Sequence, residues 1–558
     1  MLHFGKPSVA APIAERRPVS RVVHNTTLTD DYGWLRADNW QAALRDPSLL
    51  PADITAYLQA ENAHAGALLE PLEPVIADLV AEMRGRIKED DTGVPVPDGP
   101  FDYYERYREG GQHPLICRRP RGGDTEHVML DGDALSEGKA FFEFGGAQHS
   151  DDHRLVAWSF DDRGSEYYTL HVRDLTTGAD LADRVPDTDG DAVWSTDGTS
   201  FFYIRLDENH RPLSVYRHRL GTTADQDELV FQEPDTTVFV QIGRAKSGGL
   251  GFITGSANET TWTRVLDLTN PETPARLVLP AGGEVKSNAD FHPSLNGVAT
   301  LLIRTNDDGA EDYKIVAAPL ATPDKANWVE IVPHRSGVLI TSFAVFRDWI
   351  VRLERENALP RIVVREIATG TEHIIAFDEQ AYALGISDGA EFDTDTLRFV
   401  YSSMTTPTET WDYDMRQRTR ILRKRQEVPS GHNPSAYVTR RLFATAADGE
   451  TVPISLLARA DTPLDGSAPL LLYGYGSYGS SMPASFSTGR LSFVDRGFVF
   501  AIAHIRGGME KGYRWYRQGK REHKTNTFTD FIACAEHLIA KGYTKAGKIV
   551  ARGGSAGG

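Results

Sequence analysis

The chain has few cysteines and no long apolar run. Its 558 residues include only Cys117 and Cys534, which lie far apart and match no metal-binding or redox spacing. A reducing, cytoplasmic environment is therefore expected. No stretch approaches the roughly 18 uninterrupted apolar residues that a membrane-spanning helix needs, and residues 1–20 lack the apolar core of a secretory signal.

Basic charge is also scarce. Lys and Arg total 60 against 78 Asp and Glu, which gives a net charge of −18. A nucleic-acid-binding protein would show a basic face, so no nucleic-acid partner is expected. An acidic protein can attract cationic substrates over a distance, but acidity also keeps a protein in solution. On charge alone, solubility is the favoured explanation for the acidic composition.

The length exceeds what one hydrophobic core supports, so we expect at least two domains. Residues 1–75 are expected to form an N-terminal arm with helices. Apolar residues recur at helical spacing over 54–69, and again over 75–87. Such stripes are more often core than partner-binding surfaces, so we expect them to be buried.

Residues 76–428 contain a repeat in which a turn precedes an apolar strand. Successive turns lie 45 to 54 residues apart. That period is typical of four-stranded propeller blades and predicts an all-β, seven-bladed propeller. A pair of β-sandwiches is the alternative, but a period kept through all the units argues against it. The turns are Asp98-Gly99, Asp152, Asp197-Gly198, Gly248-Gly249, Asn296-Gly297, Arg347-Asp348 and Asp395.

Residues 429–558 have a different texture. Continuous apolar segments at 469–476 and 498–508 end in glycine, which is typical of buried parallel strands. A helix is predicted over 526–540, with Asn526 as its cap. Its predicted buried stripe is Phe528, Phe531, Ile532, Ala535, Leu538 and Ile539. A last strand and a glycine-rich turn follow, so this part is predicted to be an α/β domain.

The turn at 553–557 reads Gly-Gly-Ser-Ala-Gly and fits G-x-S-x-G, the nucleophile elbow of α/β hydrolases. This chemistry needs Ser555 on a strained bend at the end of a strand, with small residues on both sides. A glycine-rich tail is the alternative. The strand that leads directly into the motif favours the elbow, and Ser555 is therefore predicted to be a nucleophile.

A serine hydroxyl needs a histidine base oriented by a carboxylate. In α/β hydrolases both partners follow the serine, whereas only three residues follow Ser555 here. His504 and His537 are the nearest upstream histidines, and we interpret both as structural. The 558 residues are therefore expected to lack a complete triad and to be inactive alone.

Several segments resemble the hydrolase domain of the oligopeptidase B branch of the prolyl oligopeptidase family of serine peptidases. They are residues 471–479, 490–508, 515–543 and 553–558, and the likeness extends to 30–40 and the propeller region. The resemblance implies a seven-bladed propeller capping an α/β-hydrolase domain (429–558), on which the N-terminal arm packs. It also implies a peptidase that cuts short peptides after Lys or Arg and uses no metal or cofactor.

The resemblance assigns roles at the site. The second tyrosine of YGYG, Tyr475, would donate its hydroxyl to the oxyanion, and the backbone N–H of Ala556 would be the other donor. Ser477-Tyr478 replaces the Gly-Phe of relatives that cut after proline. The triad Asp and His, and the acids that bind the P1 side chain, are implied beyond residue 558.

Two departures from the family pattern stand out. Met509 replaces the third glycine of the usual IRGGGE. Pro483 and Ser485 occupy places where some bacterial relatives carry acids that bind a second basic residue, which argues against a dibasic preference.

Two other functions stay open. The first is a catalytically inactive fragment or a peptide-binding propeller protein. The second is a prolyl oligopeptidase, acylaminoacyl-peptidase or esterase specificity.

Overall fold

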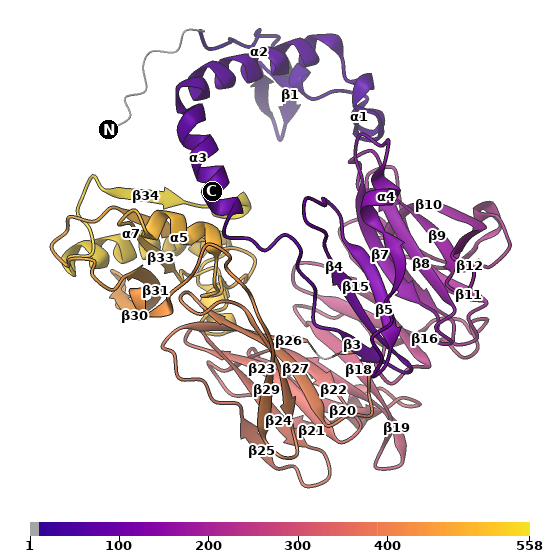
Figure 1. Ribbon diagram of the computed structural model, residues 1–558. Coiled ribbons are helices and arrows are strands. Elements are labelled where there is room, and N and C mark those ends of the chain that lie inside the picture. Colours follow the sequence, from indigo (N-terminus) through magenta and orange to yellow (C-terminus); the bar gives the residue numbers. More distant parts are fainter. Residues whose placement is uncertain (1–9, 388) are drawn as a thin grey trace.

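The computed structural model describes residues 10–387 and 389–558. β-Sheets of the central segment lie beside a smaller α/β unit built from the C-terminal segment, and the N-terminal segment arches over both (Figure 1). No helix within the described ranges is both long and apolar enough to span a lipid bilayer.

The central segment is a β-propeller of antiparallel sheets. Five of its sheets have four strands, and one has seven, in the order β13-β12-β11-β10-β9-β8-β7. The four-stranded sheets are β3 (Val96–Asp98), β4 (Phe101–Arg106), β5 (Leu115–Pro120) and β6 (His127–Asp131); β14 (Phe239–Arg244), β15 (Leu250–Ser256), β16 (Thr261–Asp267) and β17 (Arg276–Leu279); β18 (Ser287–Leu295), β19 (Val298–Thr305), β20 (Lys314–Pro319) and β21 (Val329–Val332); β22 (Leu339–Val345), β23 (Trp349–Glu356), β24 (Leu359–Glu366) and β25 (Glu372–Ile374); and β26 (Tyr382–Ser387), β27 (Thr396–Ser403), β28 (Glu409–Asp414) and β29 (Thr419–Arg425).

The seven-stranded sheet contains one long strand shared by its two halves. The residues of β10 from 179 to 188 pair with β9, and those from 188 to 194 pair with β11. The helix α4 (Gly132–Ser136) precedes this sheet. Its strands are β7 (Glu143–His149), β8 (Leu155–Asp161), β9 (Tyr168–Asp174), β10 (Ala179–Trp194), β11 (Ser200–Leu206), β12 (Pro212–Arg219) and β13 (Glu228–Gln232).

The predicted repeat is confirmed at the level of its turns. Each expected turn lies between two consecutive strands of one sheet: the first joins β3 to β4, and the last joins β26 to β27. The first and last sheets also touch, because the Arg398 guanidinium donates a hydrogen bond to the Pro95 carbonyl at 2.7 Å. Apolar side chains fill the space between neighbouring sheets, as do Phe346, Trp349 and Phe399 between the last two.

The C-terminal segment forms one five-stranded sheet in the order β30-β31-β33-β32-β34. Its strands are β30 (Tyr437–Thr445), β31 (Thr451–Arg459), β32 (Leu470–Tyr473), β33 (Val499–Ala503) and β34 (Ile549–Arg552). The last three strands run parallel, which confirms the α/β prediction. The helices are α5 (Thr488–Val494), α6 (Tyr513–Arg517) and α7 (Thr525–Ala540).

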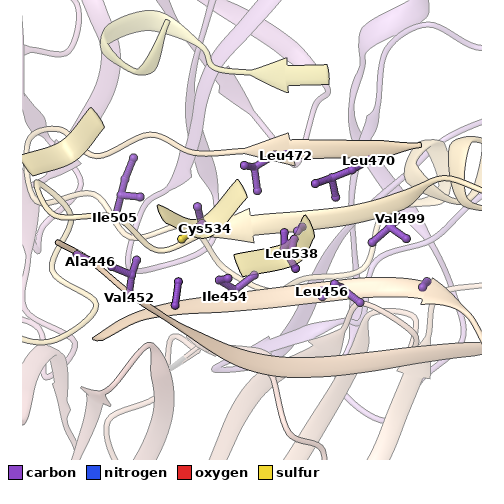
Figure 2. Packing of buried hydrophobic residues seen from close by; sticks show 14 of the residues in the cluster. Ala446, Val452, Ile454, Leu456, Leu470, Leu472, Val499, Ile505, Cys534 and Leu538 are labelled. Carbon is purple, nitrogen blue, oxygen red and sulfur yellow. The ribbon is translucent and has the colours of Figure 1, made fainter. Parts of the chain in front are cut away.

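Helix α7 covers one face of this sheet. Cys534 and Leu538 pack on Leu470, Leu472 and Val499, all fully buried (Figure 2). Each buried leucine contributes roughly 1.5–3 kcal/mol to stability. The predicted stripe of α7 is confirmed in part, because Leu538 is buried and Phe531 and Ala535 pack against the core. Phe528 and Ile532 differ from the prediction, since they are 57% and 55% exposed while Asp530 is fully buried.

The reason for this difference is an ion pair. Asp530 accepts hydrogen bonds from the backbone N–H, Nε and Nη2 of Arg506, at 3.0, 2.8 and 2.6 Å. This pairing buries a polar residue of α7 next to the apolar face that packs on the sheet. The predicted cap is also wrong, since α7 begins at Thr525 and Asn526 instead donates to the Gln518 carbonyl.

The N-terminal segment bridges the two units. It contains β1 (Val19–Val23), β2 (Thr26–Asp30), α1 (Trp40–Arg45), α2 (Ala52–Leu69) and α3 (Glu73–Arg84). Arg45 forms an ion pair with Asp187 of the propeller at 2.7 Å. Near the end of α3, Glu82 pairs with Arg496 of the α/β unit at 2.7 Å.

The predicted burial of the two arm helices is wrong. In α2 only Ile54 is buried, and in α3 no residue is. The physical reason is the path of the arm, which arches away from both units between its two contacts (Figure 1). Its exposed apolar residues include Leu58, Leu69, Val75, Val80 and Ile87.

The propeller and the α/β unit are joined through three propeller turns. Glu259, between β15 and β16, accepts hydrogen bonds from the Tyr513 hydroxyl and Lys520 Nζ, both at 2.7 Å. Asp312 accepts from the Tyr513 backbone N–H at 2.7 Å, and the Ala358 N–H donates to the Glu510 carbonyl at 2.6 Å. These contacts hold the segment between β33 and α7 against the propeller.

A buried histidine links β10 to β12. His218 Nε2 lies 3.0 Å from Asp183 Oδ1, and its Nδ1 lies 2.7 Å from Asp227 Oδ1. Since both ring nitrogens face carboxylates, both donate and the imidazole is charged. Burial opposes that charge, but the hydrogen bonds to Asp227 and Asp183 outweigh it and raise the pKa of His218.

Replacing His218 with glutamine is expected to lower the free energy of unfolding by about 3 kcal/mol at pH 6, because a buried ion pair loses one partner. The raised pKa makes this stabilisation complete below about pH 6.5 and removes it as pH rises through the folded-state value. Urea unfolding at pH 6 and pH 9 should therefore show a larger difference at pH 6. The exposed His523, changed to glutamine, is the control; equal losses at both pH values would contradict the charged assignment.

Candidate active site

The predicted nucleophile stands on a left-handed bend directly after β34. Ser555 has φ of 53°, which a residue with a side chain rarely adopts. It is exposed and begins the short 3-10 helix Ser555–Gly557. The strand–bend arrangement that the motif predicted is present.

The flanking glycines are required by close packing. A Cβ on Gly553 would lie 1.9 Å from the Gly557 carbonyl oxygen, and a Cβ on Gly557 would lie 2.9 Å from Cα of Tyr475. The bend is closed by hydrogen bonds from the Gly557 and Gly558 N–H groups to the carbonyls of Gly554 and Ser555. The Ala556 N–H donates in neither of these two hydrogen bonds.

Tyr475 follows β32 and lies beside the bend. The Gly474 N–H donates to the Arg552 carbonyl at 3.3 Å, which joins the ends of β32 and β34. The Tyr475 side chain is half-buried, and its ring carbon Cδ2 packs against Gly557. The structure therefore brings together Ser555, Ala556 and Tyr475.

Neither upstream histidine meets the serine. His504 is buried, its Nε2 lies 2.8 Å from the Ser455 hydroxyl, and its backbone carbonyl accepts from Trp515. His537 lies on α7, twelve residues after the helix begins, and is half-buried. Within residues 10–387 and 389–558, no histidine hydrogen-bonds Ser555, and no cluster of His, Cys, Asp and Glu in these ranges could hold a metal ion.

A cavity of about 530 Å³ lies on the face of the five-stranded sheet opposite the face that α7 covers. Pro483 and Ser485 line it together with Arg490 and Arg552. Burial, aided by the charge of Arg552, lowers the pKa of Arg490 to about 10. The positions where some relatives carry acids thus adjoin two cations.

A family model described as the prolyl oligopeptidase N-terminal β-propeller domain matches residues 11–426, and one described as the prolyl oligopeptidase family matches residues 484–558. The chain belongs to the prolyl oligopeptidase family. It is a serine peptidase of that family, as the resemblance implied.

Curated relatives and solved structures support the same family assignment. Dipeptidyl aminopeptidase BI of Pseudoxanthomonas mexicana is 38% identical, over 98% of this chain and 76% of the relative. Protease 2 of Moraxella lacunata is 32% identical, over 98% and 77%. Oligopeptidase B of Leishmania major has a TM-score of 0.92 at 30% identity, covering 98% of this chain and 79% of that chain. Oligopeptidase B of Trypanosoma brucei, solved in a closed form with covalently bound antipain, has a TM-score of 0.90 at 32% identity, with the same coverage.

Met509, where this chain departs from the family pattern, contacts both units. Its side chain packs against the apolar cluster of β19, β20 and β22, which includes Leu302 and Ile315. A Cβ on Gly479 would lie 2.4 Å from Cε of Met509. The methionine is therefore accommodated by the neighbouring glycine and adds an apolar contact to the propeller.

Two polar side chains near the bend have a structural role that the sequence did not indicate. Ser477 is 9% exposed and its hydroxyl lies 3.3 Å from the Ala556 carbonyl oxygen. Lys524 donates to the Ser477 hydroxyl oxygen at 2.7 Å. No sequence pattern marked Lys524, because its partners are 47 and 48 residues away in the chain.

Proposed function

We propose that this peptidase hydrolyses peptides through an acyl-enzyme on Ser555, with the Tyr475 hydroxyl and the Ala556 N–H as oxyanion donors. The observation that carries the proposal is the bend itself. Ser555 is exposed in a left-handed conformation at the end of a parallel strand, between glycines that admit no side chain. Such strain persists where the fold enforces it, and it clusters at active sites.

In this mechanism Ser555 Oγ attacks the scissile carbonyl carbon, and the carbonyl oxygen becomes an oxyanion. The Ala556 N–H is unused by the hydrogen bonds of the bend, and Tyr475 packs directly on Gly557. Each preorganised donor at such a site is worth about 3–4 kcal/mol in the transition state. The serine proton requires a histidine–carboxylate pair, which we place outside the described residues.

The proposed substrates are short peptides cut after Lys or Arg. Two oligopeptidase B structures match this chain with TM-scores of 0.92 and 0.90, and the chain carries Ser477-Tyr478. Arg490 and Arg552 adjoin the positions that bind a second basic residue in some relatives. This pair of cations argues against a dibasic preference.

We further propose a division into an arm (1–75), a seven-bladed propeller (76–428) and a hydrolase domain (429–558). The blade number rests on β10, which pairs with β9 through its first half and with β11 through its second. Counted in this way, the seven-stranded sheet contains two four-stranded blades that share one strand. A cytoplasmic location, without metal or cofactor, completes the proposal.

A second candidate activity is the release of dipeptides from a free N-terminus. The relative at 38% identity is named a dipeptidyl aminopeptidase. Cleavage after proline is a third candidate, since relatives named prolyl endopeptidase match at 24% identity. An inert peptide-binding protein is the fourth, because no described histidine contacts Ser555.

A fluorophosphonate probe, followed by peptide mapping, should label Ser555 of the protein expressed from its complete reading frame. A panel of arylamides then separates the candidates: N-blocked arginyl, unblocked dipeptidyl-arginyl and N-blocked prolyl substrates. We expect the N-blocked arginyl substrate to be cut fastest. Faster cleavage of the unblocked dipeptide would assign dipeptide release, and failure to label Ser555 would remove the serine mechanism. Labelling of the 558-residue chain itself would contradict the inert alternative.

A further inference from the structure

A lysine joins the two chain segments that carry the proposed oxyanion donors. Lys524 stands immediately before α7 and is half-buried. Its ammonium donates to the Gly476 carbonyl at 2.7 Å and to the Ser477 hydroxyl oxygen at 2.7 Å. Gly476 directly follows Tyr475, so the first contact holds the loop that places the tyrosine.

The second contact extends to the nucleophile bend. The Ser477 hydroxyl donates to the Ala556 carbonyl oxygen at 3.3 Å. An ammonium group has only donors, so Lys524 must use a lone pair of the Ser477 oxygen, which leaves the serine proton free to point at Ala556. Ser477 is 9% exposed, so water competes little for this hydroxyl.

The charge of Lys524 meets only neutral acceptors. Among the residues that the structure describes, no carboxylate forms an ion pair with it. Its Nζ also lies 6.0 Å from the centroid of the apolar ring of Phe528. Burial lowers the pKa of Lys524. A cation without a counter-ion, held on the loop that directly follows Tyr475, can stabilise negative charge that develops near that loop.

The loop that Lys524 binds has little freedom to relax. Gly476 has φ of 67°, and a Cβ on Gly507 would lie 1.9 Å from the Gly476 carbonyl oxygen. Thr527, in the first turn of α7, donates to the Arg506 carbonyl at 2.8 Å and fixes the chain directly after the end of β33, next to the loop. The start of α7 is therefore a rigid platform for Lys524.

We propose that Lys524 and Ser477 are positioning residues that hold the Tyr475 hydroxyl and the Ala556 N–H in register, and that the Lys524 charge stabilises the oxyanion. This inference rests on the proposed serine mechanism. It assigns no proton transfer to either side chain, since Ser477 faces the Ala556 carbonyl oxygen.

The test compares Lys524→Met, Ser477→Ala and the double variant in the protein expressed from its complete reading frame, with an N-blocked arginyl arylamide. We expect kcat to fall about 10- to 100-fold for Lys524→Met and about tenfold for Ser477→Ala, with KM changed less than about twofold. Because both residues act through one chain of hydrogen bonds, the double variant should lose little more than Lys524→Met alone. Ser477→Thr keeps the hydroxyl and should recover most of the loss.

Lys541→Met is the matched control, since Lys541 is exposed at the opposite end of α7 and should leave kcat unchanged. Hydrogen exchange of residues 549–558 adds a readout that does not need activity: it should speed up in Ser477→Ala. A kcat within twofold of wild type for Lys524→Met, or losses that multiply in the double variant, would overturn the inference. Full activity of Ser555→Ala would instead overturn the proposed function, so the two failures are distinguishable.

Discussion

Replacing Ser555 with alanine is expected to lower kcat/KM for peptide hydrolysis by roughly 10⁴- to 10⁶-fold, because the loss of a nucleophile removes the covalent route. The substitution is sterically mild, since Ser555 is exposed and its bend is set by the glycines around it. Initial rates on an arginyl arylamide, with the protein expressed from its complete reading frame, measure the loss.

The matched control is Ser467→Ala, which removes an exposed hydroxyl that precedes β32, at the end of the strand away from the nucleophile bend. It should leave the rate within a few-fold of wild type. Thermal unfolding should show the same midpoint for Ser555→Ala and the unmodified protein. Cleavage that persists in Ser555→Ala would refute the proposed mechanism, whatever the substrate preference.

Replacing Asp530 with alanine is expected to reduce the stability of the α/β unit by about 3–5 kcal/mol. Asp530 is fully buried and Arg506 is 2% exposed, so the variant leaves a buried guanidinium with Asp448 as its remaining carboxylate partner. Breaking a buried pair costs more than the pair contributes, because the uncompensated charge stays in the interior.

Hydrogen exchange of the α7 amides gives the local free energy of opening and avoids the assumption that the two units unfold together. The control is Asp461→Ala, whose partner Arg459 lies 2.9 Å away in a pair 37% and 70% exposed. That surface pair should contribute less than about 1 kcal/mol. A change below 1 kcal/mol in Asp530→Ala would mean that the ion pair does not decide the orientation of α7.

The orientation of α7 shows where pattern reading fails. Helical periodicity favoured Phe528 and Ile532 as buried residues, yet both are more than half exposed. The decisive partner, Arg506, is 24 residues from Asp530 in the chain, so no local pattern reveals it. The prediction that the arm helices are buried is wrong for a related reason. A stripe of apolar residues predicts a helix but does not show which surface, if any, covers that stripe.

The nucleophile bend could be predicted because its requirements are local. A strand, two glycines and a serine within a few residues define the geometry, and Ser555 adopts φ of 53° as that geometry demands. Tyr475 was assigned by family resemblance, and the structure places it against Gly557. The link from Lys524 through Ser477 to Ala556 joins three separated segments, so it was not predictable.

The amino-acid sequence alone determined the periodic turns, the parallel strands and the serine-bearing bend, because each depends on residues close together in the chain. The tertiary structure decided which side chains meet at that bend. The order β33-β32-β34 places the ends of distant strands side by side. Three turns of the propeller hold the segment between β33 and α7. Contacts of this kind depend on packing between segments, and packing is not encoded at any single position.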